Sequence, residues 1–150
     1  MLEIKTHKRG SEIYRTERKK QVDCIIIHHT WSYSIDSCVN HWKGNKNGTH
    51  YIIDRDGTIY GMVPTLYKVN HCVGMNHNSV AIDLMRGEGE EILDVQYESL
   101  NRLISYVSSV YNIRNIELHK KGLFYHCDIR PTQCPKPIDD EKVWKWTWHK

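Results

Sequence analysis

The chain has 150 residues, of which 39% are hydrophobic and 26% are charged, and its formal net charge is +3. This length and composition are typical of a globular domain with a buried core, which excludes a disordered, collagen-like or coiled-coil protein. The small positive charge is well short of a nucleic-acid-binding footprint, so we expect no nucleic-acid partner. We find no internal repeat or low-complexity linker, and we therefore expect a monomer with one domain over residues 1–150.

Two features of the sequence bear on its cellular compartment. The longest apolar run is Ile25-Ile26-Ile27, far short of the roughly 20 residues of a membrane helix, so we expect no membrane span. The N-terminus is polar and basic with no apolar stretch behind it, which indicates synthesis in a cytoplasm without a Sec signal peptide. The five cysteines cannot all pair within one chain, which favours free thiols or a metal ligand over a disulfide framework.

The first half of the chain predicts short strands around one helix. Basic residues over 5–20 indicate a surface lead-in, and the apolar, β-branched run over 24–27 predicts a buried strand. Residues 35–43 carry apolar side chains at helical spacing, with polar residues near their start that could cap a helix. Residues 51–60 contain an Asp-Gly pair between two apolar runs, which predicts a β-hairpin.

The second half adds two more strands and two more helices. We expect strands over 80–84 and 116–118, and the best amphipathic helix of the chain over 96–111. Residues 139–148 predict a terminal helix, because three acidic residues at its start suit the positive end of the helix dipole. The fold class is therefore α/β (α+β), with a central mixed β-sheet flanked by about three helices.

Four side chains suggest a metal site. His28 and His29 end the first buried strand, while His126 and Cys134 lie in an irregular segment that contains prolines. Strand ends and loops on a rigid sheet are where sites are usually built. Two histidines and a thiolate can hold a zinc ion with one open position, which suits catalysis by an activated water. For each residue alone, a surface histidine or a buried thiol is the alternative.

The sequence resembles the zinc-dependent N-acetylmuramoyl-L-alanine amidases, and most of all the short, single-domain phage endolysins among them. Four blocks carry the resemblance, in order and with compatible gaps, at residues 26–30, 48–57, 71–83 and 126–135. The resemblance implies an amidase/peptidoglycan-recognition-like fold and one zinc ion (Zn²⁺) held by His28, His126 and Cys134. It also implies peptidoglycan as the substrate, cleaved between the lactyl group of N-acetylmuramic acid and the L-alanine of the stem peptide.

Two catalytic helpers of the phage enzymes are missing. Thr49 stands where they carry a tyrosine, and Thr132 stands where they carry a lysine. Asp83 occupies the place of a glutamate in the recycling amidases, so it is our candidate proton shuttle, with a structural strand contact as the alternative. Thr132 is a candidate for hydrogen bonding the developing oxyanion, or else it caps its loop.

Further polar residues of the matched blocks have two interpretations each. His71 matches a histidine that lines the family's groove, and it is a candidate substrate contact together with Asn76 and His50, although a structural role is favoured for His50. His29 replaces His28 as the ligand if the strand register differs by one residue. Asp128 either orients the nearby histidine ligand or caps its loop.

The remaining thiols and the C-terminal tryptophans have no assigned chemistry. We expect four cysteines to be reduced and buried: Cys24, Cys38, Cys72 and Cys127. The tryptophans could form a sugar-stacking surface, but the spacing of Trp144 and Trp148 favours core packing for at least one of them. Trp146 lies between them.

The expected biological role is that of a phage endolysin, made in the host cytoplasm and acting on peptidoglycan after release through a holin. A cytosolic muropeptide-recycling amidase and a toxin delivered by a secretion machine fit the same sequence features. A peptidoglycan-recognition protein that binds without cutting is the alternative from another class. The presence of Cys134 favours the enzyme, whereas the missing tyrosine and lysine leave the binding protein open.

Overall fold

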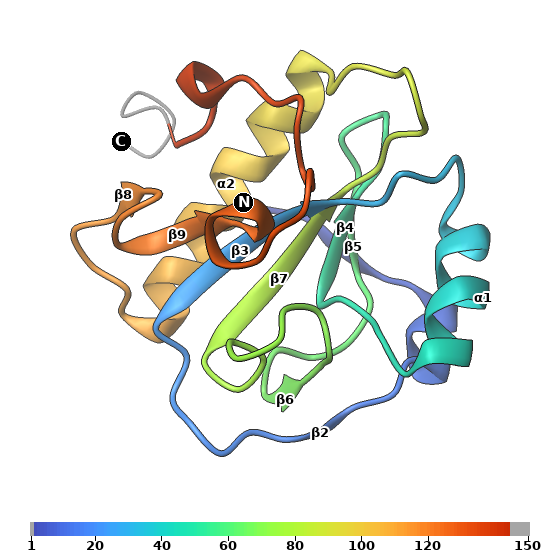
Figure 1. The fold of residues 1–150 in the computed structure, drawn as a ribbon, viewed down its shortest axis with the longest axis horizontal. Coiled ribbons are helices and arrows are strands. Elements are labelled where there is room, and N and C mark those ends of the chain that lie inside the picture. The colour runs from blue at the N-terminus through green and yellow to red at the C-terminus, as the bar shows by residue number, and fades with distance from the viewer. Residues whose placement is uncertain (1, 145–150) are drawn as a thin grey trace.

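One mixed β-sheet of seven strands runs through the centre of the computed structural model, which describes residues 2–144 (Figure 1). Its strands are β1 (Ile4–Thr6), β3 (Cys24–His29), β4 (Tyr51–Ile53), β5 (Ile59–Gly61), β7 (Ser79–Leu84), β8 (Glu117–Leu118) and β9 (Gly122–Tyr125). Their order in space is β1-β5-β4-β7-β3-β9-β8. The β4–β5 hairpin is antiparallel and the other neighbouring pairs are parallel, which confirms the predicted mixed sheet. A separate antiparallel pair joins β2 (Thr16–Glu17) and β6 (Tyr67–Lys68).

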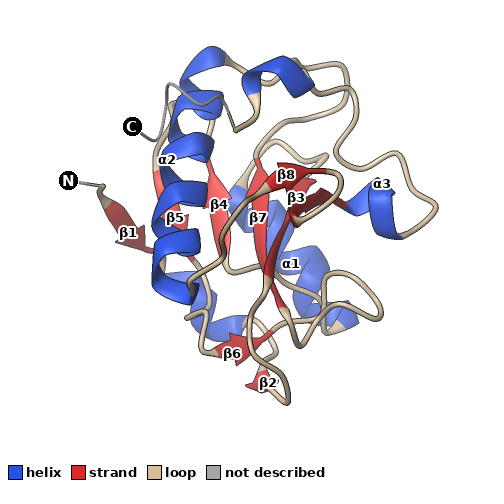
Figure 2. Cartoon of the chain, turned by 90° about the vertical axis from the view of Figure 1, so that its left-hand side faces the viewer, coloured by secondary structure: helices blue, strands red, loops and turns tan. Residues whose placement is uncertain are grey.

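Helices cover both faces of the sheet (Figure 2). The α-helices are α1 (Ile35–Asn45), α2 (Asp94–Tyr111) and α3 (His126–Ile129), and the 3-10 helices are η1 (Lys8–Glu12) and η2 (Asp140–Lys142). Helix α1 begins where the side chain of Ser34, one of the polar residues near the start of the predicted helix, accepts a hydrogen bond from the N–H of Ser37. Within the described part of the chain, none of the helices is long and apolar enough to cross a membrane.

Strand alternation decides which residues face which helix. In β3, Ile25 and Ile27 pack into the core that contains α2, whereas Ile26 lies in a different buried cluster on the other face. His28 follows Ile26 on that second face. In β7, the residues on either side of Asp83 also face the α2 core, and Asp83 pairs with His28 in register. The two polar side chains therefore share the face of the sheet that α2 leaves uncovered.

Three expectations from the sequence need correction. The segment over 5–20 is not only a surface lead-in, because Gly10 and Ile13 are buried and a Cβ on Gly10 would collide with the Met62 carbonyl oxygen. The third α-helix is α3, inside the segment expected to be irregular. The prediction of a terminal helix is wrong over residues 139–144, because only the short 3-10 helix η2 forms there and Trp144 has a left-handed φ of 58°. Residues 145–148 of that prediction lie outside the described residues.

His119 links β9, α3 and η2 beyond the end of β8. Its Nδ1 lies 2.7 Å from Asp128 Oδ2 and its Nε2 lies 2.8 Å from Asp140 Oδ2. The Tyr125 hydroxyl donates to the other oxygen of Asp140 at 2.6 Å. Partial burial opposes a charge on His119, but its hydrogen bonds with the two carboxylates outweigh burial and raise its pKa. The protonated ring donates from both nitrogens and so joins three segments.

This arrangement predicts a pH-dependent contribution to stability. A histidine with a raised pKa stabilises the fold below its unfolded pKa of 6.5, and the contribution is lost as the pH rises through the folded-state pKa. We expect His119→Gln to lower the free energy of unfolding more at about pH 6 than at about pH 9. Urea unfolding of the metal-free protein measures both values, with His41→Gln on the exposed surface of α1 as the control. Equal losses at the two pH values would contradict the charged link.

Candidate metal centre

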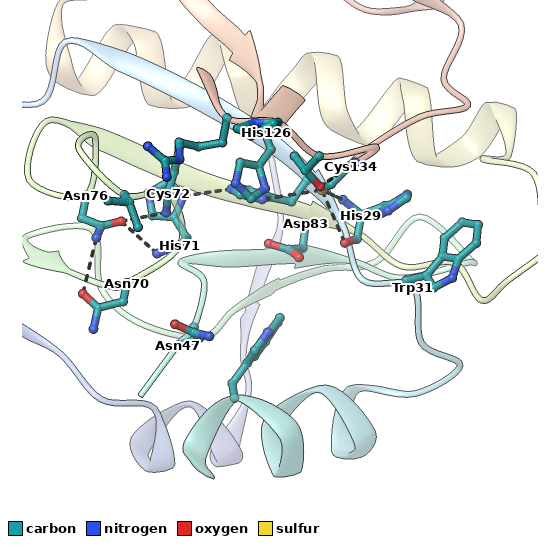
Figure 3. Close-up of a pocket in the computed structure, with 17 residues that line it drawn as sticks. His29, Trp31, Asn47, Asn70, His71, Cys72, Asn76, Asp83, His126 and Cys134 are labelled. Atoms are coloured by element: carbon teal, nitrogen blue, oxygen red, sulfur yellow. Dashed lines mark hydrogen bonds between the residues drawn. The ribbon is translucent and has the colours of Figure 1, made fainter. Parts of the chain in front are cut away.

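A cavity of about 570 Å³ opens at the carboxyl ends of β3 and β7 and beside the start of α3 (Figure 3). Parallel strands commonly present their carboxyl ends to ligands. The lining includes side chains from β3, from β7 and the loop before it, and from the segment after β9: His28, His71, Asn76, Asp83, His126 and Cys134. Residues far apart in the sequence therefore share one solvent-accessible pocket.

Three of these side chains form a group that can hold a metal ion. Single ligand atoms from His28, His126 and Cys134 all lie within 4.8 Å of one another. The Cys134 Sγ and His28 Nδ1 atoms are 3.7 Å apart. A tetrahedral zinc ion, with its usual bond lengths to nitrogen and sulfur, needs these atoms about 3.6 Å apart. The donor set and its spacing fit zinc. These three residues are the ligands that the family resemblance implies.

The sheet brings the two histidines together. Ile27 of β3 pairs with Tyr125 of β9, so the next residues, His28 in β3 and His126 at the start of α3, lie side by side. Their ring centroids are 4.6 Å apart. Cys134 comes back to them through the loop after α3, where its backbone oxygen accepts a hydrogen bond of 2.9 Å from the N–H of Cys127. The register of one strand pair and one loop contact thus build the group.

The protonation states suit metal binding for the histidines and require a cation for the thiol. Burial and the neighbouring ring of His126 hold the pKa of His28 well below 6.5, and burial also lowers the pKa of His126. Neutral imidazole is the form that binds a metal. Burial raises the pKa of the Cys134 thiol to about 12, although the backbone N–H of His29 donates to its sulfur at 3.3 Å. A bound cation is the group that would stabilise the thiolate there.

Arg86, which the sequence analysis did not identify, holds the loop that carries Cys134. Its side chain is fully buried, and it donates to the carbonyl oxygens of Pro135 and Pro137 at 2.6 and 2.5 Å. It also donates to Nδ1 of His29 at 2.8 Å. No carboxylate among residues 2–144 forms an ion pair with it. A charged residue two positions after the end of β7, next to the apolar pair Leu84-Met85, was the signal in the sequence.

The contact between Arg86 and His29 also decides which of the two histidines at the end of β3 belongs to the metal group. His29 points away from the metal group and accepts from Arg86, while His28 points into the group. Alternation along the strand separates the two rings.

Asp83 and Thr132, the two candidate catalytic residues, both line the cavity. Asp83 is only 5% exposed, and burial raises its pKa to about 7, while a hydrogen bond from Thr49 works in the opposite direction. Thr132 lies on the exposed loop, where its hydroxyl accepts from the N–H of Cys134 at 3.3 Å. The pocket therefore holds a carboxyl group that titrates near neutral pH and a hydroxyl beside the thiol.

The three candidate substrate contacts have different surroundings. His71 and Asn76 line the cavity, but Asn76 Oδ1 also accepts from the N–H groups of His71 and Cys72 at 2.9 and 2.8 Å and so holds its loop. His50 has no exposed surface. Its Nδ1 accepts from the N–H of Ala81 at 3.0 Å and its Nε2 lies 2.8 Å from the Tyr67 carbonyl oxygen. Both ring nitrogens of His50 therefore have backbone partners, and the buried ring cannot contact a substrate in the cavity. The expectation that His50 binds substrate is wrong.

Other candidate residues have structural surroundings. Asp128 Oδ2 accepts from the N–H of Tyr125 at 2.8 Å, which caps α3 and favours the capping interpretation. Trp144 packs against the core that contains α2, in line with core packing rather than sugar stacking, and Trp146 and Trp148 lie outside the described residues. All five cysteines are free, and only Cys127 among the four without assigned chemistry is incompletely buried.

Comparisons with known proteins place this site in a family. The sequence profile described as N-acetylmuramoyl-L-alanine amidase matches residues 18–137. The endolysin of Enterobacteria phage T3 is 28% identical over 104 residues, which make up 65% of this chain and 64% of that protein, so the match spans less than two thirds of the relative's length.

Two solved structures have the same fold. The N-acetylmuramoyl-L-alanine amidase LysC from Clostridium intestinale URNW superposes with a TM-score of 0.68 at 26% identity, covering 90% of this chain and 89% of its own. The Ph2119 endolysin from the Thermus scotoductus MAT2119 bacteriophage gives a TM-score of 0.72 at 21% identity, covering 95% and 100%. Because the family profile covers most of its length, the chain belongs to the N-acetylmuramoyl-L-alanine amidase family.

Proposed function

We propose that this protein is a zinc-dependent amidase that hydrolyses the bond between N-acetylmuramic acid and L-alanine in peptidoglycan. The observation that carries the proposal is the convergence of His28, His126 and Cys134 in an open pocket that also contains Asp83. Three protein ligands leave a fourth tetrahedral position for water, which is the arrangement of catalytic rather than structural zinc. Membership of the amidase family supports the substrate and the bond.

The residues of the pocket have different roles in the proposed amide hydrolysis. When bound, a zinc ion would lower the pKa of a water in its open position and polarise the substrate carbonyl. The Asp83 carboxylate takes a proton from the attacking water and returns it to the leaving amine, because it lies in the same cavity as the three candidate ligands. The Thr132 hydroxyl accepts from the loop backbone, so its own proton is available to the developing oxyanion.

The proposed setting is phage lysis of a bacterial host. The resemblance to the endolysin of phage T3 supports this role, with synthesis in the host cytoplasm and access to peptidoglycan after release through a holin. The thiol ligand favours catalysis over recognition alone, because a protein that only binds muropeptides has no need for an open metal position.

Removing the thiol ligand tests the metal site. We expect Cys134→Ala to lose most of its zinc at micromolar protein and to cleave no muropeptide, because two histidines remain and the thiolate charge is gone. Elemental analysis gives the zinc content and mass spectrometry of digested muropeptides gives the cleavage. Cys127→Ala, which removes a neighbouring thiol outside the group, is the matched control. An unchanged rate in Cys134→Ala would refute the ligand assignment, and a zinc-loaded wild type that binds muropeptides without cutting them would favour a recognition protein.

Neutralising Asp83 tests the proton shuttle. We expect Asp83→Asn to keep its zinc and to lose about 100-fold or more in kcat, as is usual when a general base is removed. In the wild type, kcat should fall as the pH drops through the pKa of Asp83, which is about 7 without metal and lower beside a bound cation. The acidic limb of the pH–rate profile should be absent in the variant and retained in Asp83→Glu, which keeps a carboxylate. Near-normal turnover of Asp83→Asn would assign the proton transfer to another group.

A further inference from the structure

A chain of hydrogen bonds leads from a candidate metal ligand into the loop before β7. Nε2 of His28 lies 2.8 Å from Nδ1 of His71, and Nε2 of His71 lies 2.9 Å from the Ser79 hydroxyl oxygen. That hydroxyl lies 2.6 Å from the backbone carbonyl oxygen of Met75. Every polar atom of the two imidazole rings is accounted for except Nδ1 of His28, which faces the Cys134 sulfur.

The direction of each hydrogen bond follows from the carbonyl at the end of the chain. A carbonyl oxygen only accepts, so the single Ser79 proton points to Met75 and the hydroxyl accepts from Nε2–H of His71. A neutral imidazole carries one N–H, so Nδ1 of His71 is an acceptor. Nε2 of His28 must then donate to it, which leaves the lone pair of His28 on Nδ1.

We propose that His71 and Ser79 are positioning residues of the metal centre, which fix the tautomer and the ring orientation of His28 so that Nδ1 is its ligand atom. This inference rests on the metal site of the proposed function, and it gives His71 a different role from the substrate contact expected from the sequence. Partners that hold the second nitrogen of a histidine ligand orient the ring and raise its basicity.

The far end of the chain is fixed to the sheet. Ser79 is fully buried and is the first residue of β7, where it pairs with Cys24 of β3. Asn76 holds the backbone of His71 through its side-chain oxygen, and the N–H of Met75 donates to the Cys72 carbonyl at 2.9 Å. The chain of hydrogen bonds therefore connects His28 to the first residue of the neighbouring strand β7.

Zinc affinity measures the contribution of His71. Competition with a chromogenic chelator should show about 10- to 100-fold weaker zinc binding for His71→Phe, which removes the acceptor. His71→Asn, whose side-chain oxygen can occupy the place of Nδ1, should recover part of that loss. His77→Phe in the same loop is the matched control, because its ring contacts the N–H of Lys19 instead, and it should bind zinc like the wild type. Unfolding of the metal-free variants identifies any that fail to fold.

The position of the proton on the rings of His28 and His71 distinguishes a positioning role from a general contribution to stability. In the metal-free protein labelled with ¹⁵N-histidine, we expect NMR to show the proton on Nε2 of both His28 and His71. Ser79→Ala should weaken zinc binding in the wild type but add no further loss in the His71→Phe background, because Ser79 acts through His71. A proton on Nδ1 of His71, or equal zinc affinities of the wild type, His71→Phe and His71→Asn, would overturn the inference and leave the proposed function standing. Failure of the wild type to bind zinc would instead overturn the proposed function and this inference with it.

Discussion

Parallel, in-register pairing of β3 with β7 and β9 is the constraint on which the candidate site depends. It places His28 opposite Asp83, and it places His126 directly after Tyr125, the residue that pairs with Ile27. The apolar residues of β3 and β7 that face α2 fix this register, because a slip of one residue would exchange the two faces of the strand. A one-residue slip of β3 would therefore bury His28 under α2 and turn the His29 ring towards His126 and Cys134 in its place.

Two buried polar networks hold the candidate ligands from opposite faces of β3. On the α2 face, Arg86 joins His29 to the carbonyl oxygens of the loop that carries Cys134. On the pocket face, His71 and Ser79 join His28 to the start of β7. Buried polar groups are costly unless all partners are present, so such networks favour one arrangement of the site over its alternatives. The two networks therefore hold His28 and the loop of Cys134 in one arrangement.

Regular features of this fold could be predicted from the sequence, and features that depend on tertiary contact could not. The β-branched run of β3 and the amphipathic pattern of α2 are local signals, and the structure confirms both elements. Helix α3 has only four residues and is capped by Asp128, so it leaves no periodic pattern. The roles of Arg86 and His71 arise from partners distant in sequence, and no motif spacing indicated them. The grouping of His28, His126 and Cys134 came from resemblance to a family, because residue types alone left each one ambiguous.

X-ray absorption spectroscopy at the zinc edge of the zinc-loaded protein tests the candidate centre most directly, because it reports the ligand atoms whatever the activity of the sample. The geometry of His28, His126 and Cys134 predicts one sulfur at about 2.3 Å and two imidazole nitrogens at about 2.0–2.1 Å, with an oxygen in the remaining position. A zinc ion without a sulfur ligand, or with more than one, would contradict it.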